Sequence, residues 1–167
     1  MIYLLDTANT HEIARLFDLY PIDGVTTNPS IIALEQKPLK KTIVEIRKVI
    51  GEKAMLHVQP ISSKTEDMVA DALRYRDLVK GNFYAKIPVT PQGIKAMRIL
   101  RDQGVNVTAT AIFTQQQGLI AAKAGADFIA PYVNRLDNIS SDGISVVSDI
   151  MKFIKAYNFN TKVLSSL

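Results

Sequence analysis

The chain has 167 residues, 47% of them hydrophobic, and a net charge of +4, which is typical of one soluble globular domain. It contains no cysteine, which excludes a disulfide framework, thiolate metal ligands and a cysteine nucleophile. Basic residues are spread along the chain and no apolar run approaches the ~20 residues of a transmembrane helix, so we expect no nucleic-acid surface and no membrane span.

Short apolar, β-branched runs alternate with longer amphipathic segments along the whole chain. Most of these runs are continuously apolar, which is typical of parallel strands covered on both faces. Strand–helix–strand repetition predicts parallel pairing with right-handed crossovers, either in a doubly wound open sheet or in a βα barrel. We expect a single domain over residues 1–167, with strands at 2–6, 24–27, 54–59, 83–88, 106–112, 127–132 and 161–166.

Helix starts are marked by local capping signals. Capping boxes are predicted at Ser63–Glu66 and Thr114–Gln117. Asn28 and Thr90 each stand before a proline, the arrangement of an N-cap followed by the first helical position. The last helix is expected to bury a stripe that comprises Ile144, Val147, Ile150, Met151 and Ile154.

Polar side chains collect at the carboxyl ends of the predicted strands, where parallel α/β folds bind their ligands. Each has a structural explanation as well: Asp6, Thr27 and Asn28 as helix caps, Gln59 and Thr110 as satisfied core groups. The candidates are Asp6, Thr27, Asn28, Gln59, Lys86, Thr110, Tyr132 and Arg135.

Lys86 is the most informative of these residues because it lies inside an otherwise apolar predicted strand, Phe83–Val89. Lysine is rarely buried unless it is paired, so an edge position or an ion pair with Asp6 is one explanation. The other is a desolvated amine, since burial disfavours the ammonium form and lowers a lysine pKa. Such an amine attacks a carbonyl carbon and forms a Schiff base.

Five segments give the chain a family resemblance that covers essentially all 167 residues. They are Leu5–Thr7, Gly24–Ser30, Ala85–Thr90, Thr108–Phe113 and Ala130–Arg135. Through them the chain resembles the fructose-6-phosphate aldolase and small transaldolase family, and the Gly-Val-Thr-Thr-Asn-Pro-Ser and Lys-Ile-Pro-Val-Thr segments are the most specific. The resemblance implies a (β/α)8 TIM barrel with Lys86 as the Schiff-base lysine, and neither a metal nor an organic cofactor.

The resemblance also implies roles for the other candidates. Asp6 would be the acid/base carboxylate, and Gln59, Thr110 and Tyr132 would hold the catalytic water. Substrate binding would fall to Thr27 and Asn28, with Arg135 on the phosphate, for which a guanidinium fork is suited. Ser166 stands next to the position where the family carries a phosphate-binding serine.

Gln59 and Tyr132 bear on the branch of the family, since transaldolases usually carry Glu and Phe there. The pair favours a class I aldolase, a lyase that forms or cleaves fructose 6-phosphate from dihydroxyacetone and glyceraldehyde 3-phosphate. A transaldolase, the pentose phosphate pathway transferase that moves a dihydroxyacetone unit between sugar phosphates, is the alternative. An inactive truncated homologue is a third. A nucleotide-binding module is disfavoured because the chain has no G-x-G-x-x-G and no P-loop.

Length is the main departure from the family, because a complete βα barrel takes ~200 residues or more. The match ends near the end of strand 7, so strand 8 and the last two helices of the barrel are expected to be missing from these residues. An unclosed sheet exposes strand edges that favour association. We expect a homo-oligomeric, cytoplasmic enzyme of sugar phosphates.

Overall fold

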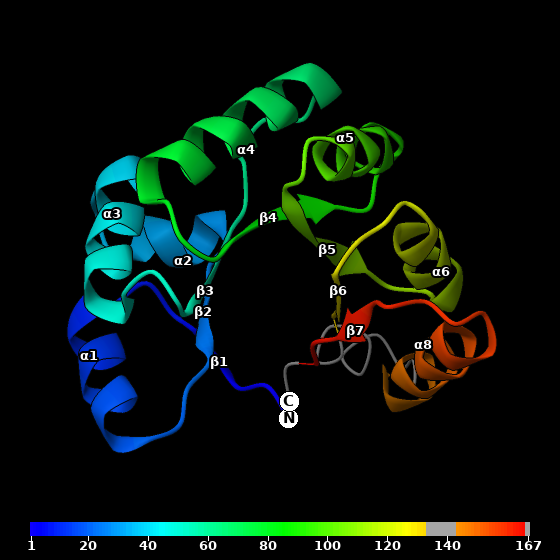
Figure 1. Ribbon diagram of the computed structural model, residues 1–167, viewed down its shortest axis with the longest axis horizontal. Helices are drawn as coiled ribbons and strands as arrows, with labels where there is room; N and C mark the ends of the chain where they lie inside the picture. The colour runs from blue at the N-terminus through cyan, green and yellow to red at the C-terminus, as the bar shows by residue number, and fades with distance from the viewer. Residues whose placement is uncertain (133–142, 166–167) are drawn as a thin grey trace. The chain divides into compact units, whose positions relative to one another are not determined.

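The computed structural model describes residues 1–132 and 143–165. Its seven strands follow one another in the sheet in chain order, from β1 to β7 (Figure 1). Helices alternate with the strands along the chain. This confirms the predicted fold class: the strand order and connections are those of the first seven strands of a (β/α)8 barrel.

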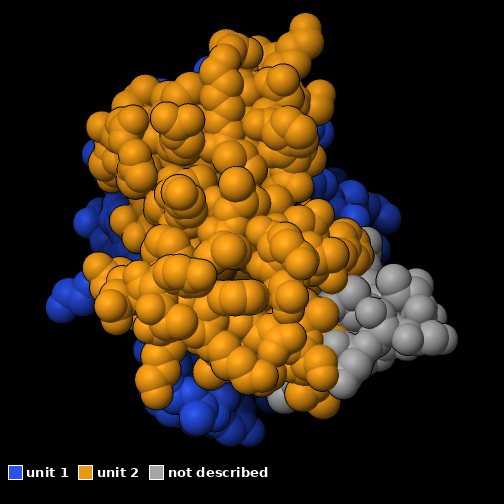
Figure 2. Space-filling view, turned by 90° about the vertical axis from the view of Figure 1, so that its right-hand side faces the viewer, with its two compact units in different colours: residues 1–62, 70–85 blue, residues 63–69, 86–167 orange. Residues whose placement is uncertain are grey.

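The chain forms two compact units, shown in blue and orange in Figure 2. Unit 1 comprises residues 1–62 and 70–85, and unit 2 comprises residues 63–69 and 86–167. The division falls within α4 (Thr65–Val79) and β4 (Phe83–Pro88), so each of these two elements contributes to both units. The single domain expected over residues 1–167 stays a prediction.

Unit 1 contains three complete strands and three complete helices. In Figure 1, α1 and α3 lie side by side along these strands, and both present fully buried isoleucines, Ile13 from α1 and Ile43 and Ile46 from α3. The elements are β1 (Leu4–Asp6), α1 (Thr10–Leu19), β2 (Gly24–Thr26), α2 (Pro29–Leu34), α3 (Leu39–Ile50) and β3 (Met55–Val58).

The register of β1 to β4 separates an apolar row from a polar row. Leu5, Val25, Leu56 and Phe83 pair in sequence across the four parallel strands, and the last three are buried. One residue further along each strand, Asp6, Thr26, His57 and Tyr84 form the next row. Because successive side chains leave opposite faces of a strand, the two rows lie on opposite faces of the sheet.

A buried arginine fastens the connections at the other end of unit 1. The Arg47 guanidinium donates to the carbonyl oxygens of Gly51 at 2.7 Å, Ala54 at 2.8 Å and Asn82 at 2.9 Å. These oxygens belong to the segments that lead from α3 into β3 and from α4 into β4. Burial lowers the pKa of the guanidinium, while the nearby charge of Glu52 opposes that shift.

Unit 2 completes β4 and contains the later strands and helices. In Figure 1, α6 and α8 lie side by side. Gly118 of α6 permits the approach, since a Cβ there would lie 2.9 Å from Cδ1 of Ile150 on α8. The elements are α5 (Pro91–Asp102), β5 (Asn106–Ile112), α6 (Gln115–Lys123), β6 (Phe128–Pro131), α8 (Gly143–Ala156) and β7 (Lys162–Val163).

Three of the four predicted helix caps are confirmed. The side chains of Asn28 and Thr90 accept from the amides of Ile31 and Gly93, and Thr114 forms the predicted capping box with Gln117. The box at Ser63 is wrong. Helix α4 begins at Thr65, and its first bond runs from the Met68 amide to the Lys64 carbonyl, so Ser63 lies one residue too early to be the N-cap.

The predicted apolar stripe of the last helix is only partly buried. Ile150 is 1% exposed, but Ile144 is 70% and Met151 56% exposed. The expectation that the whole stripe packs inward is therefore wrong. Within residues 1–132 and 143–165, none of the helices combines the length and hydropathy of a membrane span.

Candidate active site

The predicted site residues are distributed over both units. Unit 1 carries Asp6, Thr27, Asn28 and Gln59, and unit 2 carries Lys86, Thr110 and Tyr132. Arg135 and Ser166 lie outside the described residues, so their predicted role in phosphate binding stays a prediction.

In unit 1, Asp6 and Gln59 belong to the same face of the sheet. Asp6 ends β1, is exposed, and stands in the polar row with Thr26, His57 and Tyr84. Gln59 follows His57 by two residues, directly after β3, and is half-buried. Side chains two residues apart on an extended segment leave the same face. The Asp6 carboxylate and the Gln59 amide are therefore both expected on the face of the polar row.

Thr27 and Asn28 have structural partners. Thr27 is fully buried, and both its amide and its hydroxyl donate to the His57 carbonyl at 3.0 Å. The Asn28 side chain accepts from the Ile31 amide at 2.9 Å, as the N-cap of α2. The helix-cap explanation holds for Asn28, and the substrate-binding role of both residues stays a prediction.

Three members of the polar row were not predicted from the sequence: Thr26, His57 and Tyr84. The His57 ring is fully buried and is stacked on the Tyr84 ring, with centroids 4.5 Å apart and planes 8° from parallel. Both residues were visible in the sequence as the positions two before Gln59 and Lys86. The period of two predicts a shared face, but only the register shows that the two rings meet.

Lys86 is buried in the middle of β4. It is 8% exposed and stands between Ala85 and Ile87, both fully buried. It follows Tyr84 by two residues, so both side chains leave the same face of β4. The lysine therefore lies in the strand interior and not at an exposed position.

The Thr110 hydroxyl lacks a hydrogen-bond partner among the described residues. Thr110 is 1% exposed and lies on β5. Its carbonyl accepts from the Val89 amide at 2.9 Å, which fixes this part of β5 beside the residue that follows β4. Buried hydroxyls almost always have a partner, so the site is suited to a bound water or a substrate oxygen.

Tyr132 follows β6 directly and is half-buried. Its amide donates to the Ile112 carbonyl at 3.0 Å, which ties it to the end of β5. The ring meets Phe113 edge to face, with centroids 5.3 Å apart. The Tyr132 amide is therefore tied to the same end of β5 on which Thr110 lies.

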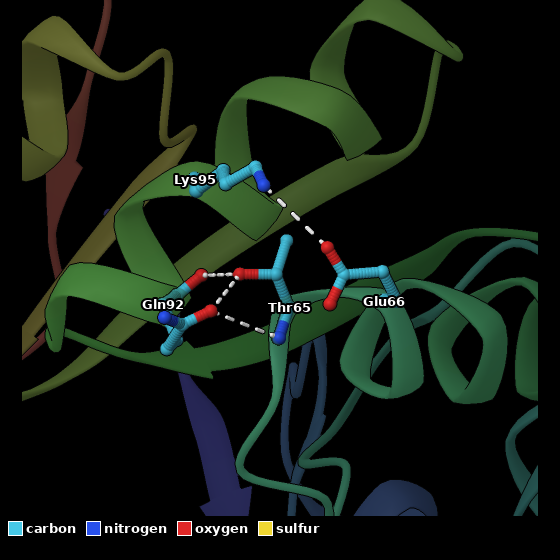
Figure 3. A network of polar contacts seen from close by, with 4 residues as sticks. All are labelled: Thr65, Glu66, Gln92 and Lys95. Carbon is cyan, nitrogen blue, oxygen red and sulfur yellow. Dashed lines mark hydrogen bonds and ion pairs between the residues drawn. The ribbon is translucent and has the colours of Figure 1, made fainter.

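A hydrogen-bonded pair joins the starts of α4 and α5 just after the Lys86 strand (Figure 3). The buried Thr65 hydroxyl donates to the Gln92 carbonyl at 2.9 Å, and the Thr65 amide donates to the Gln92 side-chain oxygen at 3.4 Å. Glu66 and Lys95 form an exposed ion pair beside it at 3.4 Å. The pair fixes the start of α5 next to the segment that follows β4, which begins at Val89, three residues after Lys86.

Two further observations on the described residues concern metal binding and cavities. No group of three or more His, Cys, Asp or Glu side chains suited to a metal ion occurs in the part of the chain that the structure describes. A shallow hollow of about 540 Å³ lies between α8 and β7, lined by Met151, Ile154, Phe159 and Val163 among others. None of the predicted site residues that the structure describes lines it.

Parallel strands alternating with helices, in the order β1 to β7, define an α/β protein of the barrel class. Residues 3–166 match the transaldolase/fructose-6-phosphate aldolase family, and the chain belongs to this family. The resemblance inferred from the five segments is thereby confirmed.

Named relatives cover nearly the whole chain. It is 39% identical to a probable transaldolase of Brachyspira hyodysenteriae, 38% identical to a probable fructose-6-phosphate aldolase of Streptococcus pneumoniae and 37% identical to a probable transaldolase of Lactiplantibacillus plantarum. Each match covers 99% of this chain and 75–76% of the relative. The chain spans about three quarters of the length of these proteins.

Solved structures support the fold alone. A 3,6-anhydro-D-galactonate cycloisomerase of Zobellia galactanivorans matches with a TM-score of 0.65 at 16% identity, and a dipeptide epimerase of Enterococcus faecalis with 0.66 at 15%. Both matches cover 99% of this chain, and 46% and 47% of the two enzymes. At this identity the likeness says nothing about chemistry.

Proposed function

We propose that the protein is a class I aldolase that cleaves and forms fructose 6-phosphate through a Schiff base on Lys86. The observation that carries the proposal is the burial of Lys86, which is 8% exposed between two fully buried residues on β4. A lysine is rarely buried in a strand interior. Membership of the transaldolase/fructose-6-phosphate aldolase family gives a chemical reason for burying one here, namely Schiff-base formation.

The reaction divides into four steps. The Lys86 amine attacks the ketone carbon of the sugar to give a carbinolamine. That carbinolamine loses its hydroxyl as water, with a proton delivered through a water held by Gln59, Thr110 and Tyr132. Asp6 then takes the proton of the hydroxyl on the carbon that leaves, as the carbon–carbon bond breaks to an aldehyde and an enamine. The enamine is protonated on carbon and hydrolysed, which frees dihydroxyacetone and the amine.

Borohydride trapping tests the proposal directly. Incubation with dihydroxyacetone and borohydride should add one reduced three-carbon unit to the peptide that carries Lys86, read by mass spectrometry. Lys86→Ala should abolish the adduct, whereas Lys152→Ala, at a lysine 72% exposed on α8, should leave it unchanged. A folded wild-type protein that gives no adduct, or an adduct that survives Lys86→Ala, contradicts the proposal.

The transaldolase reaction is the second candidate because relatives of both names match at similar identity. The aldolase is favoured by Gln59 and Tyr132, whose amide and phenol add proton donors that let the enamine be protonated without an aldehyde acceptor. Dihydroxyacetone and glyceraldehyde 3-phosphate should then yield product on their own. Product that forms only with a ketose phosphate donor assigns the chain to the transaldolases.

Assembly and location belong to the same proposal. We expect a homo-oligomer, supported by exposed apolar side chains such as Ile144, Met151 and Tyr157 of the α8 region. Analytical ultracentrifugation tests this, and a purely monomeric species contradicts it. The cysteine-free composition suits a cytoplasmic enzyme. An inactive homologue is the reading that remains if the folded protein forms no adduct.

A further inference from the structure

Ala111 has a backbone conformation that L-amino acids other than Asn and Asp seldom adopt. Its φ is +59°, in the left-handed region, where the Cβ crowds the following carbonyl oxygen. Gln36, Lys80 and Asn158 also have positive φ, but each follows a helix, where such a residue is common. Ala111 alone among these lies inside a strand.

The strained residue coincides with an irregularity of the sheet. Ala109 pairs with Ile129, and Ile112 pairs with Pro131, so three steps along β5 match two steps along β6. The extra residue is a β-bulge, which bends the strand and changes the direction of its side chains. Before the bulge the pairing is regular, with Thr108 opposite Phe128.

The residue before the strain carries the buried hydroxyl without a partner. Thr110 is 1% exposed, and its Oγ1 bonds to none of the described residues. Its carbonyl, in contrast, is bound by the Val89 amide at 2.9 Å, three residues after Lys86. Two adjacent unfavourable features, a strained backbone and an orphaned hydroxyl, therefore occur beside the strand that carries the buried lysine.

We propose that Ala111 is a positioning residue: its left-handed backbone produces the bulge that directs the Thr110 hydroxyl at one water molecule or substrate oxygen. The inference rests on the proposed function, since the oxygen it serves is that of the Lys86 reaction. Ala111 itself touches no reacting atom. It acts through the direction of its neighbour's side chain.

Substitutions at Ala111 separate this role from that of an ordinary strand residue. Strand propensity ranks Val well above Asn and Gly, whereas the left-handed region admits Gly and Asn and resists the β-branched Val. Ala111→Gly and Ala111→Asn should keep the rate of borohydride trapping within threefold of wild type. Ala111→Val should lower kcat at least tenfold with KM within twofold.

The thermal midpoints of the same variants should follow the same order, with Val lowest. Lys80→Gly is the matched control, since it relieves a φ of +51° directly after α4, at a residue outside the predicted site, and should leave the trapping rate unchanged. If Ala111→Val does not fold, Gly and Asn still decide: a tenfold loss of trapping in both folded variants overturns the inference.

A double-mutant cycle tests the link to Thr110. Thr110→Val should lower kcat at least tenfold and Thr110→Ser should restore most of it, because serine keeps the hydroxyl. In the Thr110→Val background, Ala111→Val should cost less than a further twofold, as residues that act through one group are not additive. Full multiplication of the two effects overturns the inference.

The outcomes distinguish this inference from the proposed function. If the wild-type protein forms no adduct, the proposed function fails. The order of the thermal midpoints then decides whether residue 111 requires a left-handed backbone. If the wild-type protein is trapped but Ala111→Val is as active and stable as wild type, the inference fails and the proposed function stands.

Discussion

Replacing Arg47 with methionine should strongly destabilise the protein, because this buried side chain of α3 binds three backbone carbonyls. Its guanidinium is the only cation shown to bind the carbonyls of Gly51, Ala54 and Asn82 among the described residues, at 2.7 to 2.9 Å. Arg47→Met keeps the aliphatic packing and removes all three bonds. The side chain is 7% exposed, so water reaches the vacated oxygens of Gly51 and Ala54 poorly, whereas the Asn82 oxygen keeps its bond from the Leu56 amide at 3.0 Å.

The magnitude follows from these contacts. Hydrogen bonds to a charged group are worth ~1.5–3 kcal/mol each, but the desolvation of the buried guanidinium offsets part of the total. We expect Arg47→Met to lower the free energy of unfolding by about 4 kcal/mol, which is the net value of three such bonds after that offset. With a urea slope of ~2 kcal/mol per molar, the midpoint should fall by about 2 M.

Urea titration followed by circular dichroism measures the effect. Lys48→Met, at the exposed neighbouring residue of α3, is the control and should stay within ~0.5 kcal/mol of wild type. Arg47→Lys should fall between the two, because one ammonium cannot span three carbonyls. A midpoint for Arg47→Met within 0.5 M of wild type, on the ~1–3 kcal/mol per molar scale of such slopes, would refute the reasoning.

Three further substitutions probe close approaches and burial. Gly118→Ala should cost ~1–3 kcal/mol by overpacking against Ile150, and Ile150→Val should restore part of it in thermal melts; a double variant no more stable than the single one contradicts this. Gly93→Ala should lower the free energy of unfolding by more than ~3 kcal/mol in the same assay. The new Cβ would overlap the Pro88 carbonyl oxygen, and backbone atoms shift less readily than a side chain. Burial raises the pKa of the Tyr75 phenol, so the unfolded chain loses that proton first, and stability present below pH ~10 should decline as pH rises further. Tyr75→Phe should flatten this decline in urea midpoints between pH 8 and 11, and an unchanged slope would exclude Tyr75 as its cause.

Local signals predicted the fold where the structure depends on local contacts. Asn28, Thr90 and Thr114 are N-caps because each side chain accepts from the amide three residues ahead, a spacing that can be read from the sequence. Ser63 fails as a cap because α4 begins at Thr65, whose hydroxyl donates to the carbonyl of Gln92, 27 residues further along the chain. No pattern within ten residues contains that contact.

The same distinction between local and long-range contacts applies to the residues of the candidate site. Lys86 was found because a lysine within an apolar strand is anomalous in the sequence itself, and the structure shows it buried. Ala111 was not found, because alanine fits a strand and a left-handed φ leaves no mark on its identity. Its conformation coincides with the register shift between β5 and β6, which is a property of the two strands together.

The polar row shows why register matters more than composition for this site. Asp6, Thr26, His57 and Tyr84 come from four separate segments and share no motif, yet pairing places them in one line across the sheet. A slip of one residue on any strand would exchange its polar member for the apolar one beside it. The buried partners Val25, Leu56 and Phe83 oppose such a slip, because each would move to the polar face. The apolar row thus fixes the positions of two catalytic candidates, Asp6 at the start of the polar row and Gln59 just after His57 of that row. Core packing and site geometry are therefore set by the same strand pairing.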